Sequence, residues 1–227
     1  MDIDTFRQRF ADIRRMGYVR SARRGPTGIG KTLEDLLGIT ENNISLPDLG
    51  EIELKAHRLN SSSMITLFTF NRKAWLMKPL DAVRQYGTTD NSGRLGLYFT
   101  MSRIANSSGL FLLIDDNAVS VRHISGQPVA EWNLSSLAEQ FMKKLPALLF
   151  VSAQIEERAG TEWFHFQRAQ LLSGTSVANI RDQIEIGNVK IDLRLHDKGT
   201  RARNHGTGFR ISEANLPLLY SRTEDLL

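Results

Sequence analysis

The sequence contains no cysteine, which excludes disulfide bonds and every zinc site built on thiolates. Its longest apolar runs, residues 110–114 and 147–153, are far shorter than the roughly 20 residues that a membrane-spanning helix needs. The first ten residues carry acids and lack the basic stretch, followed by an apolar run, of a signal peptide. Together these absences favour a cytoplasmic protein.

Acidic residues are missing from one basic segment and scarce in another, and the chain carries a formal net charge of +4. Residues 13–33 hold six cations and no acid, and a second basic segment spans residues 194–210. Basic segments of this kind bind polyanions, although each one alone also fits an ordinary solvated surface. Two such segments flanking a group of carboxylates favour a nucleic acid as the partner.

The apolar pattern predicts both helices and strands. Apolar residues recur every three or four positions over residues 3–16, which predicts an amphipathic helix. A glycine-rich turn at 25–30 precedes a short helix expected over 31–37 and closed by Gly38. Residues 51–55 alternate between polar and apolar, as in a half-buried strand. Further strands are expected at 65–70, 95–101, 110–115, 119–124, 147–156 and 189–195. A helix is expected at 134–145 and a short helix within 213–227. The segment at 163–172 has a mixed character.

These elements predict an α/β fold, with a mixed central sheet flanked by helices. No internal repeat, low-complexity tract or obvious linker interrupts the chain. A length of 227 residues fits one large domain, or one domain with a subdomain.

One candidate motif matches the Walker A pattern of nucleotide-binding loops. Residues 25–32 read Gly-Pro-Thr-Gly-Ile-Gly-Lys-Thr, and the apolar run before Asp115 resembles the strand that carries the second magnesium ligand. A Walker A loop follows a buried parallel strand, however, and residues 18–24 contain three arginines. We therefore interpret this loop as a glycine-rich turn that shapes the start of the following helix.

The second motif is Pro47-Asp48-Leu-Gly-Glu-Ile-Glu53-Leu-Lys55. Asp48 lies at an expected turn, and Glu53 and Lys55 are two residues apart on the polar face of the following strand. Phosphodiester hydrolysis needs a metal held by oxygen ligands and a cation beside the attacking water. Asp48 and Glu53 are the candidate Mg²⁺ ligands, and Lys55 is the candidate cation. The same spacing also arises in an exposed strand with an ordinary Glu–Lys pair.

The sequence around both motifs resembles the MvaI/BcnI family of type II restriction endonucleases and, more distantly, the mismatch-repair nicking enzyme MutH. The resemblance begins in residues 28–39 and 42–58. It continues in Ser63–Phe68, Phe164–Ala169, Asp192–Arg194 and Asn204–Ile211, so that it spans nearly the whole chain. In these relatives a helix that follows a glycine turn carries a glutamate and precedes the D…ExK motif.

The resemblance implies a PD-(D/E)xK nuclease core that uses Mg²⁺, with a smaller DNA-recognition part. The core is expected over roughly residues 1–160 and the recognition part over roughly 161–215. Glu34 joins Asp48, Glu53 and Lys55 as an expected active-site residue. Candidate DNA-binding residues are Asp192, Arg194, His205 and Arg210, with Lys73 as a possible phosphate contact. Arginine reads guanine and aspartate accepts from cytosine, which suits base reading.

The family also implies a mode of action. We expect a monomer in the prokaryotic cytoplasm that cuts double-stranded DNA one strand at a time, at a short, nearly palindromic site, with a cognate DNA methyltransferase. MvaI cuts CCWGG and BcnI cuts CCSGG, and glycine at position 208 favours CCWGG here. The alternatives are a methylation-directed nicking enzyme like MutH, a P-loop NTPase and a non-catalytic DNA-binding module. The presence of Asp48, Glu53 and Lys55 together disfavours the last of these.

Overall fold

The computed structural model describes residues 1–39, 44–46, 50–59, 64–71 and 73–227. The chain forms two compact units, each built from separate segments of the sequence. Unit 1 comprises residues 1–63, 145–175 and 220–227, and unit 2 comprises residues 64–144 and 176–219.

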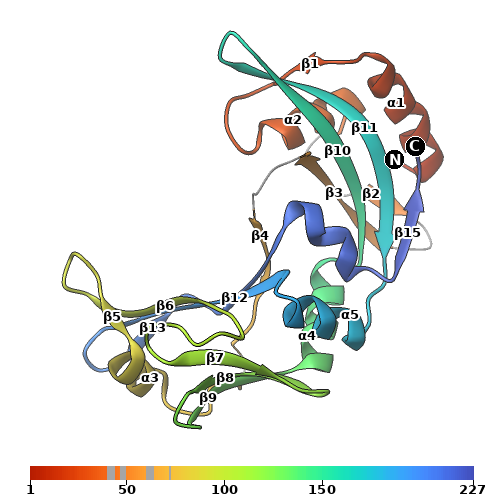
Figure 1. Ribbon diagram of the computed structural model, residues 1–227. Coiled ribbons are helices and arrows are strands. Elements are labelled where there is room, and N and C mark those ends of the chain that lie inside the picture. The colour runs from red at the N-terminus through yellow and green to blue at the C-terminus, as the bar shows by residue number, and fades with distance from the viewer. Residues whose placement is uncertain (40–43, 47–49, 60–63, 72) are drawn as a thin grey trace. The chain divides into compact units, whose positions relative to one another are not determined.

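Unit 1 contains a mixed six-stranded sheet (Figure 1). Its long central hairpin consists of β10 (Ala147–Arg158) and β11 (Thr161–Ser173), and β3 (Gly50–Arg58) pairs with β10 in parallel. The other pairings are antiparallel: β2 (Ile44–Leu46) with β3, β1 (Val19–Arg20) with β11, and β15 (Arg222–Asp225) with β11. Strand β3 therefore lies between the hairpin and the short edge strand β2.

Two helices of unit 1, α1 (Ile3–Arg15) and α2 (Gly28–Leu37), share one apolar core with the sheet. Helix α1 begins at Asp2, whose carboxylate accepts a hydrogen bond from the Thr5 backbone N–H at 2.8 Å, which satisfies one of the unpaired donors of the first turn. Ile52 is fully buried in this core, with Leu54 and Ala56 packed against it. Because side chains alternate along a strand, Glu53 and Lys55 lie on the opposite face of β3.

Two glycines define the ends of α2. Gly38 closes the helix in the left-handed conformation with φ of 67°, which glycine adopts without steric cost. A Cβ atom on Gly28 would lie 2.4 Å from the Arg23 carbonyl oxygen and 2.7 Å from the Ser21 hydroxyl. The chain before α2 thus folds back so closely on the helix start that only glycine fits at position 28.

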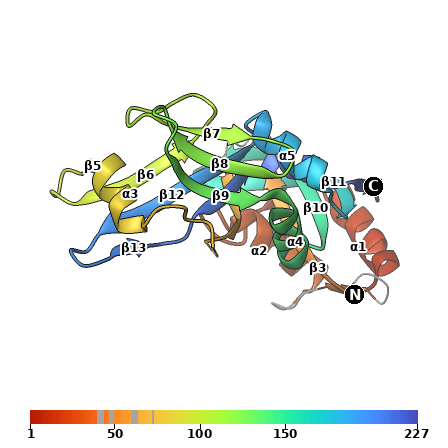
Figure 2. The same cartoon turned by 90° about the horizontal axis from the view of Figure 1, so that it is seen from below.

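Unit 2 contains two sheets. The larger follows the order β4 (Met64–Thr69), β14 (Gly208–Ser212), β12 (Val189–Asp197), β6 (Leu95–Met101) and β5 (Thr88–Thr89), with β13 (Ala202–Asn204) also paired to β12. The smaller is an antiparallel meander of β7 (Leu110–Ile114), β8 (Ala118–His123) and β9 (Pro128–Asn133), which lie side by side in Figure 2. The helices are α3 (Pro79–Tyr86), α4 (Leu134–Lys144), α5 (Val177–Glu185) and the 3₁₀ helix η1 (Glu213–Leu219).

Aromatic residues pack the core of unit 2. Phe209 on β14 stacks on Phe68 of β4 with ring centroids 5.0 Å apart, and it meets the edge of the Trp132 ring at 5.7 Å. The buried Trp132 indole donates a hydrogen bond to the Phe70 carbonyl at 2.8 Å. This contact satisfies the one polar atom of a ring that is otherwise packed among apolar groups.

The predicted mixed α/β fold is confirmed, but the division of the chain differs from the expected one. The boundary expected near residue 160 falls inside the β10–β11 hairpin, whose two strands pair along their whole length within unit 1. The segment at 163–172, expected to be of mixed character, is entirely strand. Some observed elements had no counterpart among the expected ones: helices α3 and α5 and strands β1, β2, β5, β9, β13, β14 and β15.

Within the described residues, no helix is both long enough and apolar enough to cross a bilayer.

Candidate functional site

The polar face of β3 carries an ion pair. Glu53 and Lys55 lie opposite Leu148 and Phe150 of β10 in the parallel ladder. The Lys55 ammonium donates to the Glu53 carboxylate, and the two side chains are 32% and 41% exposed, respectively. A pair that is this accessible, on a strand fixed by its neighbours, can meet a ligand without rearrangement of the backbone.

The other two residues expected in the active site have different places. Glu34 lies half-buried on α2, the helix that packs against the core face of β3. It makes no hydrogen bond or ion pair with Glu53 or Lys55. Asp48 lies outside the described residues. In the part of the chain that the structure describes, no three His, Asp or Glu side chains are grouped closely enough to hold a metal ion.

Tyr220, which no sequence motif indicated, lies near enough to Glu53 for the carboxylate charge to affect its phenol. Its buried hydroxyl donates a hydrogen bond to the Leu145 carbonyl oxygen at 3.2 Å. Burial raises the pKa of the Tyr220 phenol, and the negative charge of Glu53 raises it further. The phenol therefore stays protonated at neutral pH and donates its hydrogen bond to the Leu145 carbonyl oxygen.

His57 follows Lys55 on the same face of β3 but is not accessible. It is 4% exposed, and its ring stacks on Phe150 with centroids 4.9 Å apart. Burial lowers the pKa of His57, so the ring is neutral near pH 7. Its Nδ1 atom has no hydrogen-bond partner. We conclude that His57 supports the strand by packing.

A second group of polar side chains lies on β12 of unit 2 and its neighbours. Asp192 on β12 accepts a hydrogen bond from the Thr100 hydroxyl at 2.8 Å and forms an ion pair with Arg210 of β14 at 3.0 Å. Both carboxylate oxygens of Asp192 therefore have partners, which fixes the side chain and, through it, Arg210.

Arg194, two residues further along β12, is held by the loop before β14. Its Nε atom donates to the Gly206 carbonyl oxygen at 3.0 Å. A Cβ atom on Gly208 would lie 2.9 Å from the Arg194 Nη2 atom. Glycine at position 208 therefore leaves the space that the Arg194 guanidinium occupies.

Two histidines and a tyrosine also belong to this group of polar side chains. His205 is exposed, and its Nε2 atom lies 3.3 Å from Nδ1 of His196, which also contacts the Tyr98 hydroxyl at 2.9 Å. His196 is only 2% exposed. Its pKa is lowered by burial and by nearby cations, Lys198 first among them. A neutral His196 can therefore orient His205 by accepting or donating a hydrogen bond.

Lys73 stands apart from this group. It is exposed in the turn after β4, where it lines a hollow with Glu131 and Lys143. It makes no hydrogen bond or ion pair with Asp192, Arg194, His205 or Arg210. All five candidate DNA-binding residues belong to unit 2. Four of them lie together on and beside β12, and Lys73 does not.

The apparent Walker A loop lacks the structure of a nucleotide site. The strand before it, β1, is a two-residue antiparallel edge strand, whereas a phosphate-binding loop follows a parallel strand. The Thr32 hydroxyl is buried, donates to the Gly28 carbonyl oxygen at 2.7 Å and accepts from the Ala22 N–H at 2.9 Å. Asp115 belongs to unit 2 and caps a turn by accepting from the backbone of Asn117 and Ala118. These contacts contradict the P-loop alternative.

A mixed sheet that carries glutamate and lysine two residues apart on one strand is the arrangement of a restriction-endonuclease-like enzyme, a site-specific deoxyribonuclease. The chain belongs to the MvaI/BcnI restriction endonuclease family, whose model matches residues 7–220.

Two solved structures are similar over nearly the whole chain. The first, a complex of restriction endonuclease MvaI with its cognate DNA substrate, is 26% identical with a TM-score of 0.65, covering 99% of this chain and 98% of that chain. The second, MvaI in the absence of DNA, is 27% identical with a TM-score of 0.65, covering 99% and 97%. No curated protein sequence matches this chain.

Proposed function

We propose that the enzyme hydrolyses phosphodiester bonds of double-stranded DNA with Mg²⁺, using Glu53 and Lys55 on β3. The observation that carries this proposal is the accessible Lys55–Glu53 ion pair on a central strand of the sheet. In it, a carboxylate suited to a divalent metal is held next to an ammonium suited to an attacking water or a phosphate.

The side chains present fit a magnesium ion. Mg²⁺ prefers oxygen ligands and binds proteins through one or two carboxylates. Glu53 provides one, and Asp48, five residues earlier, is the expected second ligand. When bound, the metal supplies positive charge that neutralises the phosphate undergoing attack.

The protein's own groups have separate roles. Glu53 holds the Lys55 ammonium in place through their ion pair, and Lys55 orients the attacking water or stabilises the charge that develops on the phosphate. The protonated Tyr220 hydroxyl is a hydrogen-bond donor whose pKa responds to Glu53. Glu34 is expected to act as a second-line ligand of the metal or the water.

Base reading is proposed for the polar face of β12 and β14. Arg194 and Arg210 can bind guanine, Asp192 can accept from cytosine, and His205 can donate or accept. The ion pair and hydrogen bonds that fix these side chains support this role, because a fixed side chain loses little entropy on binding. Lys73 is proposed as a phosphate contact.

The proposed target is CCWGG. A G·C pair presents an amino donor in the minor groove and an A·T pair does not. A histidine at position 208 would provide an acceptor for that donor, and glycine provides none. We further propose that the enzyme acts as a monomer, nicks the two strands in turn, and works in a prokaryotic cytoplasm with a methyltransferase that protects the same site.

One experiment tests the core of this proposal. A plasmid of known sequence is incubated with the enzyme and Mg²⁺, with EDTA, or with ATP and no added metal, and the ends are sequenced. We expect cleavage at CCWGG with Mg²⁺ alone and none in EDTA. Full activity in EDTA or a strict need for ATP contradicts the mechanism, whereas ends at CCSGG contradict only the Gly208 argument. Single-strand nicks that depend on hemimethylation would favour an enzyme like MutH.

A further inference from the structure

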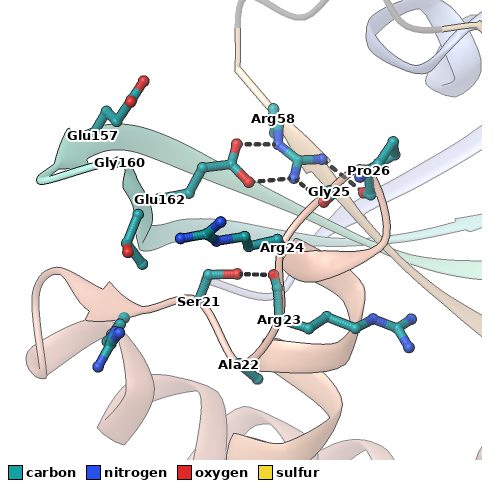
Figure 3. A pocket seen from close by; sticks show the side chains of 12 residues that line it. Ser21, Ala22, Arg23, Arg24, Gly25, Pro26, Arg58, Glu157, Gly160 and Glu162 are labelled. Carbon is teal, nitrogen blue, oxygen red and sulfur yellow. Dashed lines mark hydrogen bonds and ion pairs between the residues drawn. The ribbon is translucent and has the colours of Figure 1, made fainter.

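The loop that imitates a Walker A motif borders a basic hollow in unit 1. This hollow has a volume of about 840 Å³ and lies between the loop before α2, the end of β3 and the tip of the β10–β11 hairpin (Figure 3). Four arginines and two glutamates line it: Arg20, Arg23, Arg24, Arg58, Glu157 and Glu162. No role considered so far uses these side chains.

Arg58 fixes the shape of the hollow. Its guanidinium donates to both carboxylate oxygens of Glu162, at 3.0 and 2.8 Å, and to the carbonyl oxygens of Pro26 and Gly25, at 2.8 and 3.1 Å. Its side chain is 14% exposed. The dashed lines of Figure 3 show this clamp between the hairpin and the loop. Arg58 and Glu162 therefore neutralise each other and hold the loop in place.

The remaining charge in the hollow is net positive, because three arginines and one glutamate are left. Arg20, Arg23 and Arg24 are exposed, and their side chains make no ion pair or hydrogen bond with any residue that the structure describes. In Figure 3 the Arg24 side chain extends between Ser21 and Glu162 toward the hairpin tip, whereas that of Arg23 extends the other way. Glu157 is the only other acid in the lining. Unpaired guanidiniums on a fixed loop bind phosphate well, because each offers several donors in one plane.

We propose that this hollow binds a backbone phosphate of the DNA, with Arg20 and Arg24 as the contacts. This inference rests on the proposed function. Arg58 lies three residues beyond Lys55 on β3, about 10 Å along the strand, and its side chain lies on the opposite face, where it stacks over the Phe164 ring. The contacted phosphate therefore differs from the one being cleaved. A contact of this kind adds affinity without sequence preference.

The test measures DNA binding without cleavage. Labelled duplexes with and without CCWGG are titrated in EDTA at several salt concentrations, using wild-type protein and the double variant Arg20→Ala/Arg24→Ala. The matched control is Arg14→Ala/Arg222→Ala, which removes two exposed arginines of unit 1 that do not line the hollow. Thermal unfolding confirms that each variant is folded.

The double variant should bind both duplexes more weakly, by the same factor. Loss of this one phosphate contact should flatten the dependence of log K on log salt by about 0.9. The ratio of wild-type to variant affinity should therefore fall about 3.5-fold between roughly 50 and 200 mM salt. Glu157→Gln, which removes the opposing charge, should bind both duplexes more tightly. The control should keep the wild-type salt dependence.

Three results would overturn the inference. The first is a double variant whose affinity depends on salt as steeply as that of wild type. The second is an equal loss of affinity in the control variant. The third is binding of free ATP or inorganic phosphate that requires Arg24, together with duplex binding that does not require Arg24. Failure of the proposed function looks different, because wild-type protein would then not cleave DNA with Mg²⁺. If wild type cleaves and the double variant binds normally, only the inference about the hollow is lost.

Discussion

Glu53 and Lys55 neutralise one another on β3 in the absence of any ligand. Removing either side chain leaves the other charge without its partner at a site 32–41% exposed. The cost to folding is small, because exposed ion pairs contribute about 1 kcal/mol or less. Substitutions at these residues therefore report on chemistry and not on loss of the fold.

Lys55→Ala and Glu53→Gln should each lower the rate of plasmid cleavage by about 100-fold or more, the usual effect of losing one transition-state contact. DNA affinity in EDTA should stay close to wild type, because base reading is assigned to unit 2. Glu34→Ala should reduce the rate less. Lys144→Ala, which removes an exposed ammonium at the end of α4, serves as the control. A Lys55→Ala enzyme that cuts at the wild-type rate would refute the assignment.

Gly208→Ala tests whether the space beside Arg194 matters for specificity. The added Cβ would lie 2.9 Å from the end of a flexible side chain, so Arg194 should move while the fold survives. Discrimination between the cognate duplex and one with a single wrong base pair should fall by about 1–3 kcal/mol. Arg194→Ala should cause a similar loss, and the double variant should be no worse than Arg194→Ala alone. Additive losses would contradict this coupling.

At the scale of the element, Arg58 joins a strand, a hairpin and the loop that starts a helix. Arg58→Met keeps the length of the side chain but leaves two carbonyl oxygens and a carboxylate without their donor. We expect a loss of about 1–3 kcal/mol in the free energy of unfolding, measured by urea titration. The control is Arg168→Met, whose pair with Asp225 is 55% and 61% exposed and should contribute less than about 1 kcal/mol. Equal losses of unfolding free energy in the two variants would mean that the Arg58 contacts stabilise the fold no more than an exposed ion pair does.

Elements with one clear apolar period could be predicted from the sequence. Phe6, Phe10 and Ile13 form a single buried stripe on α1, and β6 was predicted at its observed bounds. Strand β11 was not, because the consecutive residues Ala169 and Gln170 are both buried, which breaks the alternation. Helix α3 has only eight residues, too few for a helical period to stand out.

In the candidate sites, too, some contacts could be predicted from the sequence and others could not. The Glu53–Lys55 pair follows from spacing of two on a strand, because such residues share a face. The surroundings of His196 do not, because Tyr98 and His205, which contact it, come from other strands and loops. Tyr220 lies far along the chain from Glu53, and only the fold brings the carboxylate near enough to raise the pKa of the phenol. Contacts across strands depend on register, which local sequence does not determine.

At the scale of the whole molecule, one chain carries one Glu53–Lys55 pair and one polar face on β12. A monomer with one active site must meet the two DNA strands separately. Nicked circular plasmid should therefore accumulate before linear product when enzyme is limiting, as gel electrophoresis of a time course will show. Sedimentation at the same concentration should give the mass of a monomer. Direct conversion to linear DNA by a stable dimer would contradict sequential nicking.

The interleaving of the two units along the chain has a consequence during synthesis. Strand β15 pairs with β11 in unit 1, yet the ribosome must make all of unit 2 before it reaches residues 222–225. Strand β3, with Glu53 and Lys55, is translated long before its parallel partner β10. A nascent chain therefore carries Glu53 and Lys55 well before it has the strand that pairs with β3. Glu53 and Lys55 therefore take their place in the sheet only after residues 147–158 have been made.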